Sequence, residues 1–271
     1  MRNIKTYLFF ILTLAGCVKQ TDWPLQSEQL NLLVVEGVLT DERKSQMVRL
    51  HYPVDQLNAP PAPVVGATVL ISNEDSSWAL TEKPLNSGLY FTSVTFAARP
   101  EKNYTLQIHH NNKVYTAKAS MVAGSQFQEL RYERRNDGNY YISWVASAFN
   151  GEKPAMWELL LDWSKVPGYE TRDPESCKAK VMFYTLPTLD VSEVFAPEVE
   201  EIGFPAGTII TERRYSLTPE HAEFIREMLL ETSWQGGLFT TAPANVSTNL
   251  SQGATGYFGV CAMTFVSIIV Q

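Results

Sequence analysis

The sequence predicts a mainly β protein with two tandem β-sandwich domains, the second of which contains one inserted α-helix. Short segments of alternating apolar and polar residues recur from residue 30 to residue 271, separated by turn-forming residues, as is typical of β-sandwiches. With 45% hydrophobic and 19% charged residues over 271 positions, the composition is that of a folded chain and excludes wholesale disorder. A helical pattern interrupts the strands at residues 218–231.

The first 16 residues predict a secretory signal peptide. Arg2 and Lys5 precede an apolar run over residues 7–15 that is too short to cross a bilayer. The run ends in Leu14-Ala15-Gly16-Cys17, which resembles the lipobox of bacterial lipoproteins.

We therefore expect acyl chains such as palmitate on Cys17, and a tether over residues 17–29 that holds the protein on the outer membrane. The side of the membrane on which it stands is left open, because the residues after Cys17 contain little sorting information.

The first domain is expected over residues 30–124. Its proline-rich stretch at 55–63 cannot lie in a central strand, and Asn111-Asn112 suits a left-handed hairpin turn. The predicted strands cover residues 32–40, 46–54, 67–72, 78–82, 89–92, 104–108 and 114–117.

The second domain is expected over residues 125–271. Trp157, Leu159, Leu161 and Trp163 share one face of a half-buried strand and are interpreted as core. The predicted strands cover residues 128–132, 140–145, 156–164, 178–185, 208–215 and 260–270. The unit resembles a fibronectin-type sandwich with additions.

The inserted helix has a clear start signal. Thr218 is expected to be the N-cap and Pro219 the first helical residue. Ala222, Ile225 and Leu229 then form an apolar stripe, which predicts that one face of the helix packs on a sheet.

Charge and residue usage argue against several functions. With 22 Lys+Arg and 29 Asp+Glu, the net charge is −7, which disfavours nucleic acid as a partner. Three cysteines and four histidines leave little material for a metal centre or a Cys/His nucleophile. We expect no cofactor, no metal and no catalytic residues, so the chain is not expected to be an enzyme.

Individual polar and aromatic residues support no enzyme site. His109-His110 is interpreted as part of an exposed hairpin, and His221 as a surface residue on the first helical turn. Glu198, Glu200 and Glu201 indicate a solvated acidic loop. Trp78 could stack on a sugar face or could cover the core of its own hairpin.

Two cysteines would remain after lipidation of Cys17. Cys177 and Cys261 could form a disulfide in an oxidising envelope, or could be two buried free thiols. The sequence leaves both alternatives open.

Several motifs resemble the domain of unknown function 4249 family, a group of lipoproteins from Bacteroidetes-type bacteria. They run, after the Cys17 lipobox, through Leu33-Val34-Val35-Glu36-Gly37-Val38-Leu39-Thr40-Asp41, Gly66-Ala67-Thr68-Val69, Gly88-Leu89-Tyr90, Tyr104-Thr105-Leu106, Tyr215-Ser216-Leu217-Thr218, Gly236-Gly237-Leu238-Phe239, Pro243-Ala244-Asn245-Val246, Asn249 and Gly256-Tyr257-Phe258-Gly259. The first-domain pattern also resembles carboxypeptidase-regulatory-like sandwiches of the transthyretin-like type.

The resemblance implies an envelope lipoprotein often encoded beside TonB-dependent outer-membrane receptors, with no established catalysis. It favours an accessory binding partner of such a transporter. A surface adhesin or structural module is the alternative, and a hydrolase is disfavoured. Phe239, in the loop over residues 236–249, and Trp78 are the candidate partner contacts. The alternative for this loop is that it packs the helix against the sandwich.

Overall fold

The computed structural model describes residues 32–54, 59–125, 127–188, 201–233 and 246–271. The chain is mainly β, with 45% strand in several open sheets, which confirms the predicted fold class. The described residues contain one α-helix, α2 (Pro219–Ser233), and a short 3-10 helix, η2 (Pro174–Cys177).

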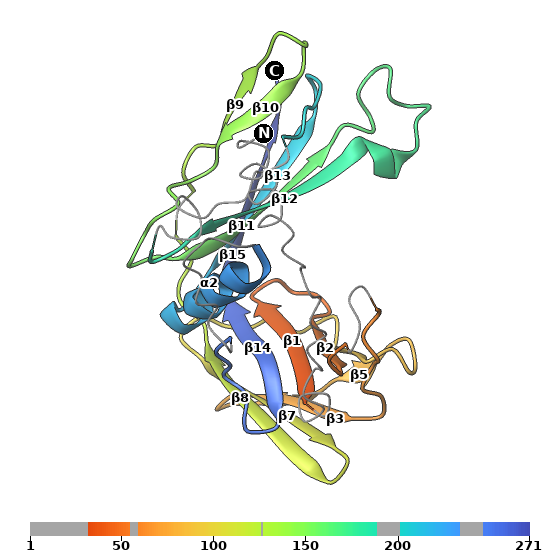
Figure 1. Cartoon of the computed structure of the whole chain (residues 1–271), viewed down its shortest axis with the longest axis vertical. Helices are drawn as coiled ribbons and strands as arrows, with labels where there is room; N and C mark the ends of the chain where they lie inside the picture. Colours follow the sequence, from red (N-terminus) through yellow and green to blue (C-terminus); the bar gives the residue numbers. More distant parts are fainter. Residues whose placement is uncertain (1–31, 55–58, 126, 189–200, 234–245) are drawn as a thin grey trace, which may run out of the picture.

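A first sandwich forms the lower half of Figure 1. Its strands are β1 (Leu33–Thr40), β2 (Met47–His51), β3 (Thr68–Ser72), β4 (Ser77–Ala79), β5 (Thr81–Glu82), β6 (Leu89–Phe91), β7 (Asn103–His110), β8 (Lys113–Ser120) and β14 (Ala254–Cys261). One sheet has the order β14-β1-β2-β6-β5 and the other β4-β3-β7-β8. Inward residues such as Val35, Leu106 and Phe258 are fully buried between the two sheets.

A second unit forms the upper half of Figure 1. Its strands are β9 (Arg131–Arg134), β10 (Tyr140–Trp144), β11 (Ala155–Asp162), β12 (Lys178–Thr185), β13 (Ile209–Ser216) and β15 (Met263–Ile269). A sheet of order β12-β11-β13-β15 packs against the β9–β10 hairpin. Trp157, Leu159 and Leu161 are buried in this core, as predicted from their shared face.

Helix α2 lies between the two units (Figure 1). Thr218 caps it, because its hydroxyl accepts the backbone N–H of His221 at 3.3 Å. Ala222 and Ile225 are buried with Leu217 from the second unit and Cys261 from β14. The predicted N-cap and apolar stripe are thus observed, and the stripe covers both units at once.

The end of the chain differs from the predicted single strand over residues 260–270. β14 pairs with β1 in parallel, with Leu33 opposite Ala254 and Thr40 opposite Cys261, so it belongs to the first sandwich. Ala262 separates it from β15, which pairs with β13 in the second unit. The two units are therefore not the consecutive stretches 30–124 and 125–271, because the first sandwich takes its last strand from near the C-terminus.

The predicted strand over residues 78–82 is also divided. β4 pairs with β3 and β5 pairs with β6, which belong to opposite sheets of the first sandwich. Leu80 lies at the crossing and is buried, and its backbone N–H donates to the Val69 carbonyl at 2.9 Å. Burial of Leu80 explains the break, since the chain passes through the edge of the core there.

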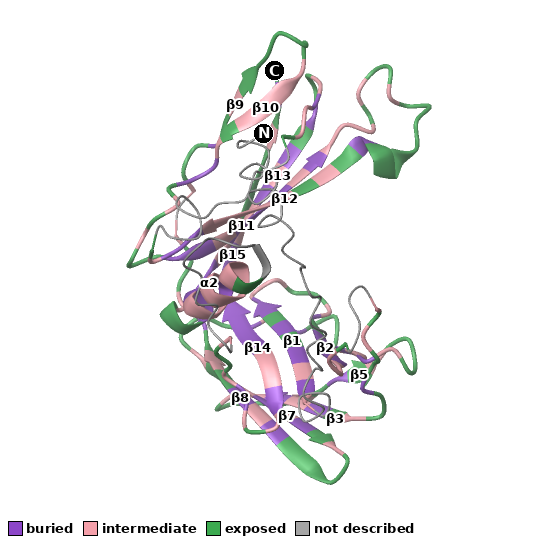
Figure 2. Cartoon of the chain, in the orientation of Figure 1, coloured by how far each residue is buried: buried purple, intermediate pink, exposed green. Residues whose placement is uncertain are grey.

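Burial follows this architecture. In Figure 2 buried residues follow β1 and β14, whereas the tip of the β7–β8 hairpin is exposed. Asn111 and Asn112 form that turn with φ values of 47° and 59°, as the sequence predicts.

Candidate functional site

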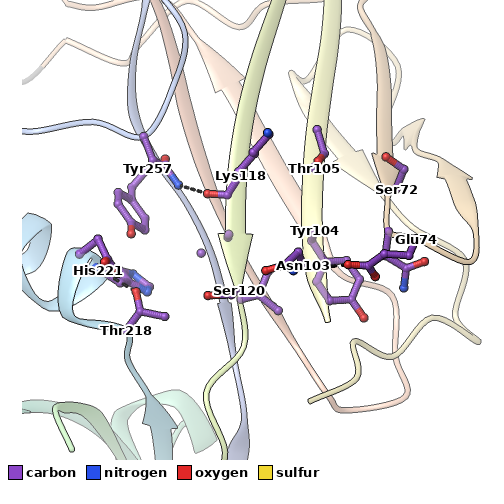
Figure 3. A pocket seen from close by; sticks show the side chains of 16 residues that line it. Ser72, Glu74, Asn103, Tyr104, Thr105, Lys118, Ser120, Thr218, His221 and Tyr257 are labelled. Atoms are coloured by element: carbon purple, nitrogen blue, oxygen red, sulfur yellow. Dashed lines mark hydrogen bonds between the residues drawn. The ribbon is translucent and has the colours of Figure 1, made fainter. Parts of the chain in front are cut away.

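The junction pocket is a cavity of about 560 Å³ at which β8, β14 and the start of α2 meet. Tyr257, His221 and Thr218 line one side of it, and Ser120, Asn103 and Glu74 line the other (Figure 3). The pocket therefore draws on segments from both halves of the sequence, and its size falls in the range of small-ligand sites.

His221 is buried at the helical end of this pocket, with 5% of its surface exposed. Its ring stacks on Tyr257 at 4.5 Å between centroids, and Tyr257 stacks on Phe224 at 4.7 Å. A Cβ on Gly259 would approach the imidazole Cε1 to 2.5 Å, so this glycine makes room for the ring. The expectation that His221 is a surface residue was wrong, because the helical pattern does not reveal that β14 covers the first turn.

Cys261 lies beside His221, with 3.7 Å between its Sγ and the imidazole Nδ1. Burial lowers the pKa of His221 to about 4. Burial, reinforced by Asp41, raises the pKa of Cys261 to about 12. A Cys/His nucleophile requires an accessible thiolate, whereas this thiol is fully buried and neutral near pH 7. The pair is therefore a packing contact.

Asn249 joins the two walls of the pocket. Its Nδ2 donates to the Lys118 carbonyl of β8 at 3.0 Å and to the Phe258 carbonyl of β14 at 2.7 Å. Its Oδ1 accepts the Phe258 backbone N–H at 3.1 Å. One amide side chain thereby holds strands of two different sheets together.

Replacement of Asn249 by alanine is expected to lower the free energy of unfolding by about 2 kcal/mol, because part-buried backbone groups lose their partners. Urea denaturation of Asn249→Ala measures this loss. Asn136→Ala, which removes an exposed amide in the β9–β10 turn, is the matched control. Equal midpoints for the two variants would contradict the role of Asn249.

The pocket surface combines polar groups of mixed charge with a somewhat larger apolar area. Glu74 and Glu220 are acidic, Lys118 is basic, and the remaining polar groups are hydroxyls, amides and His221. A backbone hydrogen bond and contacts with Asn103 and Lys102 lower the pKa of Glu74, which is therefore ionised near pH 7. No group of three or more His, Cys, Asp or Glu residues that could hold a metal occurs in the described residues. This surface suits a neutral, hydrogen-bonding ligand.

A comparison with models of protein families shows which family the chain belongs to. The model of a family described as a domain of unknown function, number 4249, matches residues 19–265. The chain belongs to this family. No curated protein matches the sequence. Within the described ranges, no helix is long and apolar enough to cross a membrane.

The segments that carry the resemblance to the 4249 family meet in the fold. Gly256-Tyr257-Phe258-Gly259 lies in β14 directly beside Leu33–Thr40 of β1. Tyr104, Thr218, Asn249 and Tyr257, which all belong to such segments, line the junction pocket. Motifs that are far apart in this family member's sequence therefore surround one cavity.

The structure describes only one of the two candidate partner contacts, and a partner for either residue stays a prediction. Trp78 packs against the first core, with its ring 5.0 Å from that of Phe96 in an edge-to-face arrangement. This matches the alternative in which it covers its own hairpin. Phe239 lies outside the described residues, as do Glu198 and Glu200.

The remaining polar residues occupy surface positions. His109 is exposed, and His110 is half-buried with its Nε2 3.0 Å from the Tyr52 hydroxyl. Glu201 forms an exposed ion pair with Arg135, and the two groups lie on the second unit. None of these three residues lines the junction pocket. Their positions agree with an exposed hairpin for the histidines and a solvated loop for Glu201.

Cys177 and Cys261 are both buried and free. Cys177 lies at one end of β11, where its carbonyl accepts the backbone N–H of Trp163, next to Asp162. Cys261 lies near the other end of β11. Its neighbour Ala262 accepts the backbone N–H of Ser216, which pairs with Ala155. Seven residues of extended strand span about 23 Å, and disulfides need Cα atoms within about 7 Å. Of the two alternatives left open, the structure has the free thiols rather than the bridge.

Thiol counting tests this arrangement. A Cys17→Ala variant, denatured without reductant, is expected to expose two alkylatable thiols, because Cys177 and Cys261 are unpaired. The same preparation treated with reductant provides the control and should give the same count. A count of zero before reduction would show a bridge.

Proposed function

We propose that the protein is a non-catalytic lipoprotein of the bacterial envelope that assists a TonB-dependent outer-membrane transporter in holding or admitting its substrate. A lipid on Cys17 anchors it to the outer membrane. The observation that carries this proposal is the junction pocket, a cavity with hydrogen-bonding groups between the first sandwich and the start of α2, on a chain whose start resembles a lipoprotein signal. The family resemblance, which implies genes beside such transporters, supports the same role.

The pocket favours binding over catalysis. Its imidazole and the neighbouring thiol are neutral near pH 7 and packed against each other. Its other polar groups are hydroxyls, amides, the Glu74 and Glu220 carboxylates and the Lys118 ammonium, which orient a ligand through hydrogen bonds. A section of a neutral polar nutrient, such as an oligosaccharide or a peptide, fits this chemistry.

Crosslinking and affinity purification from native envelopes test the partnership. The wild-type protein is expected to recover a TonB-dependent transporter, and Cys17→Ala is expected to lose it because the anchor is absent. Recovery of no outer-membrane receptor, together with unchanged nutrient uptake in a deletion strain, would contradict the proposal.

A pocket-filling substitution tests the role of the junction pocket. Ser120→Trp places a large side chain in the cavity from an exposed position on β8 and is expected to reduce uptake without loss of the transporter. Ser143→Trp, at an exposed position on β10, is the matched control. Equal uptake by the two variants would argue against the pocket as the binding site.

The lipid anchor is testable separately. Mass spectrometry of the native protein is expected to find a diacylated or triacylated cysteine at position 17 as the first residue. A mature chain that begins elsewhere, without lipid, would remove the anchor from the proposal.

The edge of the second sheet favours one alternative, a surface adhesin or structural module. Phe265 and Ile269 of β15 are 66% and 62% exposed. No strand in the described part of the chain pairs with the outer edge of β15, and such edges are sites of strand addition. Phe265→Lys distinguishes the two roles, because it should weaken cell-surface association under this alternative and leave uptake unchanged.

A further inference from the structure

A second cavity, the Arg214 pocket, lies in the second unit and has a volume of about 500 Å³. It opens between the start of β11, the end of β12, the connecting residues Gly124, Ser125 and Gln128, and the segment around residues 146–153. Arg214 lines it from β13, and Lys153 lines it from the loop before β11. None of the residues that line it is acidic, although the whole chain has a net charge of −7.

The strand alternation of β13 turns Arg214 inward. Ile210, Glu212, Arg214 and Ser216 share the buried face, and Arg214 is 3% exposed. The guanidinium lies 5.3 Å from the centre of the Trp157 ring. Its Nη1 donates to the Ser216 hydroxyl at 2.8 Å and its Nη2 to the Lys153 carbonyl at 3.5 Å. These partners are all neutral.

A buried cation without a counterion is costly, since desolvation is not offset by an opposite charge. In the ranges that the structure describes, no carboxylate pairs with Arg214 or Lys153. Burial alone lowers the pKa of Arg214, with no acidic group acting on it. Glu212 shares the inward face, but no ion pair joins it to Arg214 among the described contacts, and its Oε1 has no hydrogen-bond partner there. The described residues therefore supply no negative charge that would offset Arg214.

The polar side chains of the pocket leave hydrogen-bond donors free. The Gln128 Oε1 accepts the Ser147 backbone N–H, and the Asn150 Oδ1 accepts the backbone N–H groups of Glu152 and Lys153. The amide NH₂ ends of Gln128 and Asn150 thus remain available to a ligand. A pocket with two cations and free amide donors needs a ligand rich in acceptors.

We propose that the Arg214 pocket binds the oxyanion group of a small polar ligand, a carboxylate or a phosphate, with Arg214 as the main contact and Lys153 as the second. The planar guanidinium presents paired N–H donors to two oxygens of such a group, and the ammonium adds charge at the open side. This assignment is independent of the proposed membrane role, because it rests on the second unit alone.

Calorimetric titration of the purified mature protein tests this site with inorganic phosphate, acetate and glucuronate as probes at constant ionic strength. Saturable binding of at least one probe is expected, and glucose serves as the neutral match for glucuronate. Preference for phosphate or for the carboxylates identifies the oxyanion. Absence of saturable binding by all three anions, or equal binding of glucose, would overturn the proposal.

Substitutions locate the binding. Arg214→Gln is expected to weaken binding about 10-fold or more, as loss of a charge-assisted contact does. Lys153→Gln is expected to weaken it about 3-fold, and because Lys153 is exposed this variant keeps the test valid if Arg214→Gln does not fold. Lys113→Gln, at the exposed tip of the β7–β8 hairpin, is the matched control and should bind as the wild type does. Unchanged affinity in Lys153→Gln and in a folded Arg214→Gln would place the anion elsewhere.

Discussion

Replacement of Gly256 by alanine is expected to lower the free energy of unfolding by more than about 3 kcal/mol, a loss reserved for strained or overpacked positions. Gly256 lies in β14 opposite Val35 of β1 and has a φ of +93°. A Cβ at this position would lie 2.2 Å from the Val35 carbonyl oxygen, which is backbone and cannot move aside. Both the contact and the backbone conformation therefore oppose a side chain.

A matched glycine separates these two causes. Gly138 has a φ of +88°, and a Cβ there would meet nothing within 4 Å. Gly138→Ala should therefore cost only about 1–2 kcal/mol from the unfavourable conformation. Urea denaturation of both variants measures the difference. If Gly256→Ala were as mild as Gly138→Ala, the close approach of β1 and β14 would be refuted.

Replacement of Glu212 by glutamine is expected to change how stability depends on pH. Glu212 is 3% exposed, and burial raises the pKa of its carboxyl from 4.5 to about 7. Between these values the folded chain binds more protons than the unfolded chain, so the wild type loses stability as pH rises from about 4.5 to about 7. The loss is on the order of 2–3 kcal/mol, and Glu212→Gln should not show it.

Denaturant titrations at pH 5, 6, 7 and 8 measure this effect. Glu129→Gln, which removes an exposed carboxylate, is the control and should keep the slope of the wild type. Parallel profiles for the wild type and Glu212→Gln would show that the Glu212 carboxyl is ionised in the folded state over the whole range.

His221 acts with the opposite sign over an overlapping range. Because burial lowers its pKa from 6.5 to about 4, the unfolded chain binds the extra proton between these values. Its contribution makes the protein less stable as pH falls from about 6.5 to about 4. In the wild type the effects of Glu212 and His221 on stability partly cancel between pH 4.5 and 6.5. In Glu212→Gln the loss of stability at low pH that His221 causes should therefore become visible.

Local features of the fold were predictable from the sequence because their causes are local. The Asn111-Asn112 turn, the Thr218 cap and the inward face of Trp157 and Leu159 follow from backbone preference and alternation. These signals act over fewer than ten residues. They therefore predict the elements, and with them the mainly β class.

The arrangement of the candidate site was not predictable in the same way. The burial of His221 depends on Gly259 and Tyr257 of β14, and Arg214 is buried only because the second unit closes around it. Such contacts join segments far apart in the chain, and hydrophobic alternation contains no information on which strands pair. For the same reason a bridge between Cys177 and Cys261 could be neither predicted nor excluded from spacing.

The position of β14 in the first sheet determines when that sheet can be completed during synthesis. Leu33 pairs with Ala254, so β1 cannot pair with β14 until more than 200 further residues have left the ribosome. Until then, one edge of β1 presents unpaired N–H and C=O groups to other chains. A chain leaves the ribosome N-terminus first, so the first sandwich begins to form early and is completed late. The first sandwich can therefore be completed only after nearly the entire chain has been synthesised.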